Sequence, residues 1–182
     1  MAFKQAKKRE PLGEAALFEY AVRALGRRMR SVRDLRRLMK TRAPEGAEGE
    51  EAIDAVVVRL KEMNYLSDTR FAADYTRLRK ENEKFGRRRV QQDLAGKGVS
   101  QDLAQAALKS AYEDVDEVGL ARQYVARKRM KQPSGANAEK ETARVMGRLL
   151  RAGFSSNAIF KLLRSWNLAV EEFDVEDGEG AG

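Results

Sequence analysis

Pairs of apolar residues recur along this chain at a fixed spacing of 55 residues. The three pairs are Leu35 and Met39, Val90 and Leu94, and Val145 and Leu149. Residues four apart lie on one face of an α-helix, so each pair predicts a short amphipathic helix. A repeat of this length is typical of helical arrays, in which neighbouring units complete one another's hydrophobic cores. Amphipathic helices can recur by chance, but Gly98-Val99-Ser100 also recurs at this spacing as Gly153-Phe154-Ser155.

Residues 64–112 predict the three helices of one such unit. Ser67 or Asp68 can cap the first helix, whose apolar residues fall on one stripe at Phe71, Tyr75 and Leu78. The second helix opens after Gly86 and is ended by Gly96 and Gly98. The third begins at Ser100, with Leu103, Ala107 and Leu108 buried. We therefore expect an all-α fold without a sheet, built as an elongated, curved array of three tandem three-helix repeats.

The repeats are predicted over residues 14–66, 67–115 and 116–168, with an enlarged loop in the first at 42–49. Residues 1–13 are expected to form a flexible basic arm. Residues 169–182 contain six acidic residues and no Lys or Arg, which is typical of a disordered acidic tail.

The middle repeat carries a motif that resembles the RecX family, bacterial regulators of the RecA recombinase. The resemblance rests on a structural set made of Tyr65, Leu66, Asp68, Arg70, Phe71, Tyr75, Gly86 and Gly98. The chain departs from the family pattern at Ser67, where Asp or Asn is usual, and in its longer first loop. The resemblance implies a monomer that binds RecA and its filament on DNA. It also implies that this binding inhibits ATP hydrolysis, strand exchange and cleavage of the SOS repressor.

The composition narrows the chemistry that the chain can carry out. It contains neither His nor Cys, which removes the imidazole base, the thiolate nucleophile and the usual zinc ligands. The carboxylates show no clustered spacing and no glycine-rich loop follows a strand, so we expect no enzyme, no metal and no cofactor. No apolar run is long enough to span a bilayer and no signal peptide is visible, which favours a cytoplasmic protein that binds no membrane.

Positive charge is concentrated on the first and second helices of each predicted repeat. Residues 120–168 alone carry a net charge of +9, although the whole chain carries only +8. The candidate surface for a RecA filament or DNA comprises Arg77, Lys80, Lys84, Arg87, Arg88, Arg89, Lys140, Arg144, Arg148, Arg151, Arg23, Arg27, Arg36 and Arg37. The run 87–89 opens a helix, where cations oppose the helix dipole, so stability explains it poorly. The alternative is a solvated charged face, with ion pairs such as Arg70 with Asp74 and Arg77 with Glu81.

Two other functions fit the same residues. One is a DNA-binding module, since short helices joined by tight turns overlap with helix-turn-helix patterns. No helix concentrates base-reading side chains, so such binding would be weak, directed at phosphates and independent of sequence. The other is a non-catalytic helical adaptor.

Overall fold

The computed structural model describes residues 10–167, and within this range every regular element is helical. The helices are α1 (Glu14–Arg27), α2 (Val32–Lys40), α3 (Ala47–Glu62), α4 (Asp68–Glu83), α5 (Arg87–Gly96), α6 (Gln101–Tyr112), α7 (Glu117–Arg127), the short 3-10 helix η1 (Gly135–Asn137), α8 (Ala138–Arg151) and α9 (Ser156–Arg164). The prediction of an all-α fold is confirmed. Most of the predicted basic arm and the predicted acidic tail lie outside the described residues.

Contacts group the chain into two compact units. The first contains the residues up to Ala72 together with Ala95–Leu103, and the second contains Ala73–Leu94 and the residues from Ala104 onward. Helices α4, α5 and α6 each contribute residues to both units. The three-repeat boundaries follow the residue pattern rather than this grouping, and they stay a prediction.

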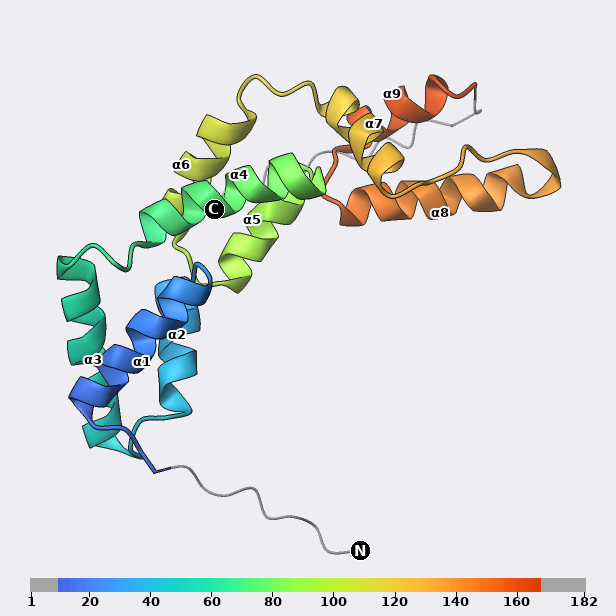
Figure 1. Cartoon of the computed structure of the whole chain (residues 1–182). Coiled ribbons are helices and arrows are strands. Elements are labelled where there is room, and N and C mark those ends of the chain that lie inside the picture. Colours follow the sequence, from blue (N-terminus) through green and yellow to red (C-terminus); the bar gives the residue numbers. More distant parts are fainter. Residues whose placement is uncertain (1–9, 168–182) are drawn as a thin grey trace, which may run out of the picture. The chain divides into compact units, whose positions relative to one another are not determined.

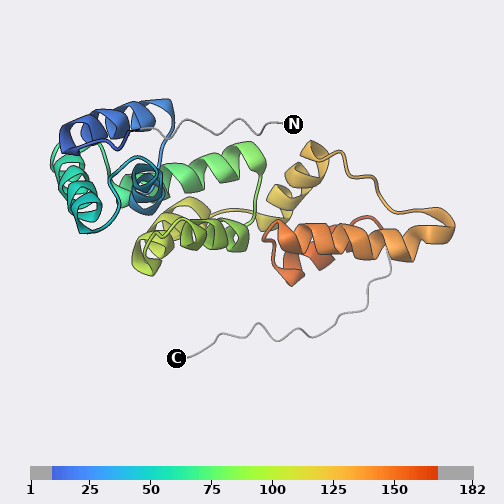
Figure 2. The same cartoon turned by 90° about the horizontal axis from the view of Figure 1, so that it is seen from below.

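The core of the first unit lies between α1, α2 and α3, which pack side by side in Figures 1 and 2. Leu17 from α1, Leu35 and Met39 from α2, and Leu60 from α3 are fully buried. Tyr20 and Leu38 are only partly buried and line the edge of this core.

The core of the second unit is formed largely by α7, α8 and α9. Phe154, Leu149 and Leu162 have no exposed surface, and the rings of Phe154 and Tyr124 pack in an edge-to-face arrangement with centroids 5.7 Å apart. Trp166 packs against this core but is only partly buried.

The predicted apolar stripes of the middle repeat are correct in part. Phe71, Val90, Leu94 and Leu108 are buried. Leu103 and Ala107 are only partly buried, and Tyr75 is half-buried because its hydroxyl reaches a polar partner. Leu78 was wrongly assigned to this stripe, since the burial of α4 passes instead through Ala72 and Thr76 and leaves Leu78 37% exposed.

In the first unit, the start of α2 packs on the turn between α5 and α6. The Ser31 hydroxyl donates to the carbonyl of Lys97 at 2.7 Å, and the Arg33 guanidinium donates to the carbonyl of Gly96. Gly98 has a φ of 74°, and a Cβ on it would collide with the Arg33 side chain. The turn is therefore shaped to admit the first residues of α2.

An equivalent contact occurs in the second unit, where the helix start and the turn each lie 55 residues later in the sequence. The amide of Gly86 donates to the carbonyl of Ala152 at 2.8 Å, and the amide of Arg88 donates to the carbonyl of Gly153 at 3.3 Å. Gly153 has a φ of 90°, and a Cβ on it would come closer to the Arg89 amide nitrogen than real Cβ atoms do. The first amides of α5 thus bond to carbonyls at the end of α8, which satisfies donors that a helix N-terminus leaves free.

We expect Gly153→Ala to lower the free energy of unfolding by about 1 to 3 kcal/mol, because it adds a Cβ to a residue at positive φ beside a backbone amide. Gly147→Ala is the matched control, since a Cβ there meets only the end of the flexible Arg151 side chain within α8. Alanine in a helix interior should leave stability unchanged or raise it by roughly 0.5 to 1 kcal/mol. Urea unfolding followed by circular dichroism measures both; equal stabilities for the two variants would contradict the close contact.

Candidate binding surface

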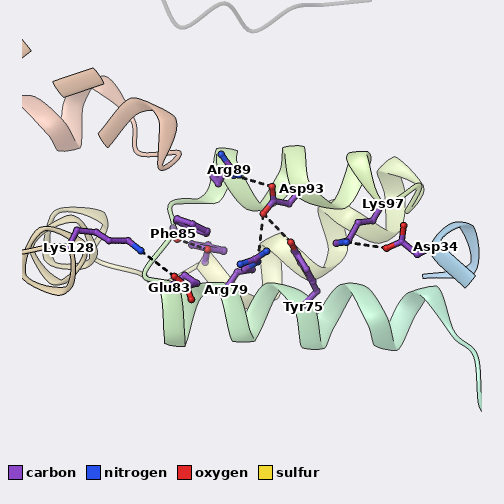
Figure 3. Close-up of polar contacts among 10 residues, drawn as sticks. Asp34, Tyr75, Arg79, Glu83, Phe85, Arg89, Asp93, Lys97 and Lys128 are labelled. Carbon is purple, nitrogen blue, oxygen red and sulfur yellow. Dashed lines mark hydrogen bonds and ion pairs between the residues drawn. The ribbon is translucent and has the colours of Figure 1, made fainter. Parts of the chain in front are cut away.

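Asp93, on α5, is the centre of a polar network that ties α5 to α4. Its carboxylate accepts hydrogen bonds from the Tyr75 hydroxyl at 3.1 Å and from Arg89 Nε at 3.0 Å, and Arg79 Nε lies 3.7 Å away (Figure 3). The Asp93 side chain is only 16% exposed, so its charge needs these partners. Burial is the main cause that raises the pKa of the Tyr75 phenol, which keeps it a donor to Asp93.

Phe85 lies between the two arginines of this network. The guanidinium carbons of Arg79 and Arg89 are 5.7 Å and 5.5 Å from its ring centroid, within the range of cation–π attraction. Its carbonyl accepts a hydrogen bond from the Tyr112 hydroxyl at 2.8 Å, and burial raises the pKa of that phenol. Neither Phe85 nor Asp93 was predicted from the residue pattern. The available signals were an aromatic residue just after a helix and an acidic residue four positions after Arg89.

Glu83, at the end of α4, holds two cations from the end of α7. Its carboxylate oxygens lie 3.2 Å from Arg127 and 3.5 Å from Lys128. Burial acts to raise the pKa of Glu83, but hydrogen bonds and charge from Arg127 and Lys128 outweigh it and lower that pKa below its ordinary value.

The predicted basic patch of the middle repeat contains cations with different surroundings. Arg77 forms ion pairs with Asp74 and with Glu81, as predicted for the second. Lys80 donates to the carbonyl of Ala111 at 2.8 Å. Their charges are thus directed to neighbouring groups of the chain.

The three arginines at 87–89 also differ in their surroundings. Arg89 bonds to Asp93 and lies against Phe85, so the view that stability explains this run poorly is wrong for Arg89. Arg87 and Arg88 are exposed, with Arg87 bonded to the neutral side chain of Gln105 at 3.1 Å, and Lys84 is partly buried.

In the first unit, Arg36 on α2 is held by acidic residues of α3. It pairs with Glu50 at 3.4 Å and with Asp54, and Lys40 also pairs with Glu50 at 2.6 Å. The candidates Arg23, Arg27 and Arg37 are exposed, and no ion pair is recorded for them within residues 10–167. Within the same range, the bond recorded for Arg23 is to the carbonyl of Glu19 in its own helix.

Helix α8 carries the longest run of exposed cations without described acidic partners. Lys140, Arg144, Arg148 and Arg151 are all exposed, and none of them is paired with a carboxylate in the described part of the chain. Their spacing places them on one side of α8, while Val145 and Leu149 face the core. We call these four residues the α8 ridge.

The motif residues act mainly through the backbone and helix caps. The Ser67 hydroxyl caps α4 by accepting from the Arg70 amide at 3.3 Å, while the Asp68 carboxylate accepts from the Val32 amide at 2.8 Å and so caps α2 instead. Arg70 donates to the carbonyl of Asn64, and the predicted pair of Arg70 with Asp74 is not formed because Asp74 pairs with Arg77. Leu66 is buried, but the Tyr65 side chain is 56% exposed.

Within residues 10–167 no group of three or more His, Cys, Asp or Glu could hold a metal ion. In the same range no helix combines the length and the apolar character that crossing a bilayer requires.

An all-α chain in which one helix-to-turn contact recurs at the period of the sequence is a helical-repeat protein. A family model described as "RecX, second three-helix domain" matches residues 67–108. Regulatory protein RecX of Escherichia coli (strain SE11) is 37% identical over 122 residues, which cover 63% of this chain and 70% of that protein. Regulatory protein RecX of Trichlorobacter lovleyi is 31% identical over 142 residues, which cover 78% of this chain and 90% of that protein.

A crystal structure of RecX from Lactobacillus salivarius has a TM-score of 0.62 at 19% identity, and the match covers 86% of this chain and 97% of that one. This similarity concerns the fold, and it agrees with the sequence matches. The chain belongs to the RecX family of regulatory proteins.

We expect Arg89→Gln to lower the free energy of unfolding by about 1 to 3 kcal/mol, because it takes a charged hydrogen-bond partner from the poorly exposed Asp93. Arg144→Gln removes the same charge from an exposed position of α8 and should change stability by no more than about 0.5 kcal/mol. Chemical denaturation compares the two; equal losses would show that Arg89 is as dispensable to the fold as Arg144.

Glu83→Gln should lower stability by at most about 1 kcal/mol at neutral pH, since its ion pairs are partly screened by solvent. The folded-state pKa of Glu83 is lowered, so its contribution is present above the ordinary Glu pKa and is lost as the pH falls through the lower folded value. The stability difference between wild type and variant should therefore shrink in acid.

Glu62→Gln is the control for this pH series, because Glu62 is exposed and forms no recorded ion pair among the described residues. It should change stability little at any pH. A Glu83→Gln effect of constant size from neutral pH to pH values below the folded pKa would contradict the role given to Arg127 and Lys128.

Proposed function

We propose that this protein regulates the RecA recombinase by binding RecA and its nucleoprotein filament. Binding would inhibit the RecA ATPase, strand exchange and the stimulation of SOS repressor cleavage, and so would modulate recombination and the SOS response. The observation that supports this most strongly is membership of the RecX family, whose curated members are named regulatory proteins.

The charges of the described residues refine which part of the candidate surface binds. Cations held by carboxylates of the chain, such as Arg36, Arg77 and Arg89, would lose those partners on binding an external anion. The α8 ridge has no such partners to give up among residues 10–167. The net gain of electrostatic free energy on binding an anion is therefore expected to be largest at the α8 ridge, followed by the exposed Arg87 and Arg37.

No catalytic step is required for this function. A protein that occupies the surface of a filament stops turnover by steric exclusion and by favouring one filament conformation. Under this proposal, inhibition of RecA is proportional to the fraction of filament sites that this protein occupies, and it requires no cofactor or metal.

The test is the DNA-dependent ATPase of RecA, titrated with this protein at several salt concentrations. We expect wild type to inhibit, and the double variant Arg144→Gln/Arg148→Gln to need an about tenfold higher concentration, which corresponds to about 1.4 kcal/mol of binding free energy. Higher salt should weaken wild-type inhibition, because exposed charges are screened.

The control Lys61→Gln/Arg122→Gln removes the same total charge from exposed positions outside the candidate surface, and it should inhibit like wild type. Equal inhibition by both double variants would remove the α8 ridge from the binding surface. Absence of inhibition by wild type at every salt concentration would refute the proposed function. Anisotropy of the same DNA without RecA separates inhibition through the filament from simple coverage of DNA.

A further inference from the structure

The α8 ridge is a concentration of positive charge that the described part of the chain does not neutralise. Its four cations lie along one side of a helix, from Lys140 to Arg151, over roughly 16 Å at 1.5 Å per residue. Like charges four residues apart on a helix repel one another and cost a few tenths of a kcal/mol per pair. Glu139 and Glu141 adjoin only the Lys140 end of the ridge. An anion laid along this side of α8 would relieve the repulsion.

The chain itself carries a polyanion directly after α9. Residues 168–182 contain Glu171, Glu172, Asp174, Glu176, Asp177 and Glu179, and no Lys or Arg. The six carboxylates fall within nine residues, so their charge density along the chain is as high as that of the ridge. We call residues 168–182 the acidic segment.

The last described residues, which precede the acidic segment, lie beside the chain that leads into α8. Helix α9 packs against α8, and Trp166 lies against the core that α8 helps to form. The Trp166 carbonyl accepts a hydrogen bond of 2.6 Å from Gln132, in the segment that leads through η1 into α8. The chain therefore leaves α9 beside the approach to the N-terminal end of α8.

The acidic segment is long enough to follow the whole ridge. Glu179 is the twelfth residue after Asn167, and twelve residues reach roughly 40 Å at about 3.3 Å per residue when extended. The ridge needs less than half of this length. A tethered segment also meets its site at an effective concentration in the millimolar range, so that weak contacts suffice for occupancy.

We propose that the acidic segment docks on the α8 ridge and shields it from other anions. Neighbouring cations of the same unit are less suited to it, because Arg127 and Lys128 are held by Glu83, and Arg89 by Asp93. The docking itself is independent of the proposed function. Its regulatory consequence rests on that function: an acidic or phosphate-bearing partner must displace the segment, which sets an affinity threshold for binding.

The docking is tested on the full-length protein alone. Because the chain has no Cys, Val175→Cys gives a single site for a nitroxide spin label in the middle of the acidic segment. We expect the amide signals of α8 between Lys140 and Arg151 to be broadened at about 0.05 M salt and to recover at about 0.5 M salt. The matched reference is α2, whose exposed Arg33 and Arg37 form another cationic helix face.

A second variant shows whether charge is the cause. Replacing the six acidic residues by Gln or Asn in the labelled protein should abolish the broadening on α8. Broadening of α2 equal to that of α8, or broadening of α8 that survives neutralisation or high salt, would overturn the proposal. These experiments use no RecA, so their outcome tests the docking independently of the proposed function.

The shielding is tested with single-stranded oligothymidylate as a simple polyanion. Neutralising the acidic segment should tighten binding at low salt about tenfold, and adding Arg144→Gln/Arg148→Gln should remove that gain. An unchanged affinity after neutralisation would refute the shielding. A gain that persists without the two arginines would show that the segment covers a different surface.

Discussion

The structure depends on a contact in which the start of one helix meets a turn closed by a left-handed glycine. In the second unit the first amides of α5 donate to the carbonyls of Ala152 and Gly153. In the first unit the start of α2 meets the turn at Gly98, where the Ser31 hydroxyl replaces the amide as donor to the equivalent carbonyl. Backbone groups make much of this contact, so its geometry can be retained while side chains vary. The spacing of 55 residues is thus a spacing of contacts as well as of apolar pairs.

The contact also clarifies which charges remain for binding. An arginine run at the start of α5 would oppose the helix dipole, but carbonyls from the end of α8 lie against that N-terminus and supply negative partial charge. Arg89 is then used by Asp93 and Phe85, and Arg36, Arg77, Arg127 and Lys128 have carboxylate partners of their own. The net charge of the chain therefore overstates what is available to a partner. The α8 ridge differs from these cations because no carboxylate of residues 10–167 is paired with it.

The sequence predicted the helices well because their apolar positions repeat with the helical period and their ends carry Ser or Gly. The prediction failed at Leu78, because helical periodicity alone does not show which of two adjacent faces of a helix packs against the core. It failed at Arg70, which bonds to Asn64 outside its own helix rather than to Asp74. It left open whether Ser67 or Asp68 caps α4; Ser67 does, and Asp68 bonds instead to Val32. It missed Asp93 because Tyr75, which donates to it from α4, is 18 residues away, and it missed Phe85 because Tyr112, which donates to its carbonyl, is 27 residues away. Charge patterns locate cations, but only tertiary structure shows which are already bound.

We propose that cations without acidic partners among residues 10–167, above all those of α8, form the surface that binds RecA. Hydrogen–deuterium exchange of this protein, free and bound to a RecA filament, tests it most directly. The account predicts that binding slows exchange most in α8 (Ala138–Arg151) and leaves the paired face of α2 and α3 around Arg36 and Asp54 nearly unchanged. Protection centred on that paired face, with α8 exchanging as in the free protein, would contradict it.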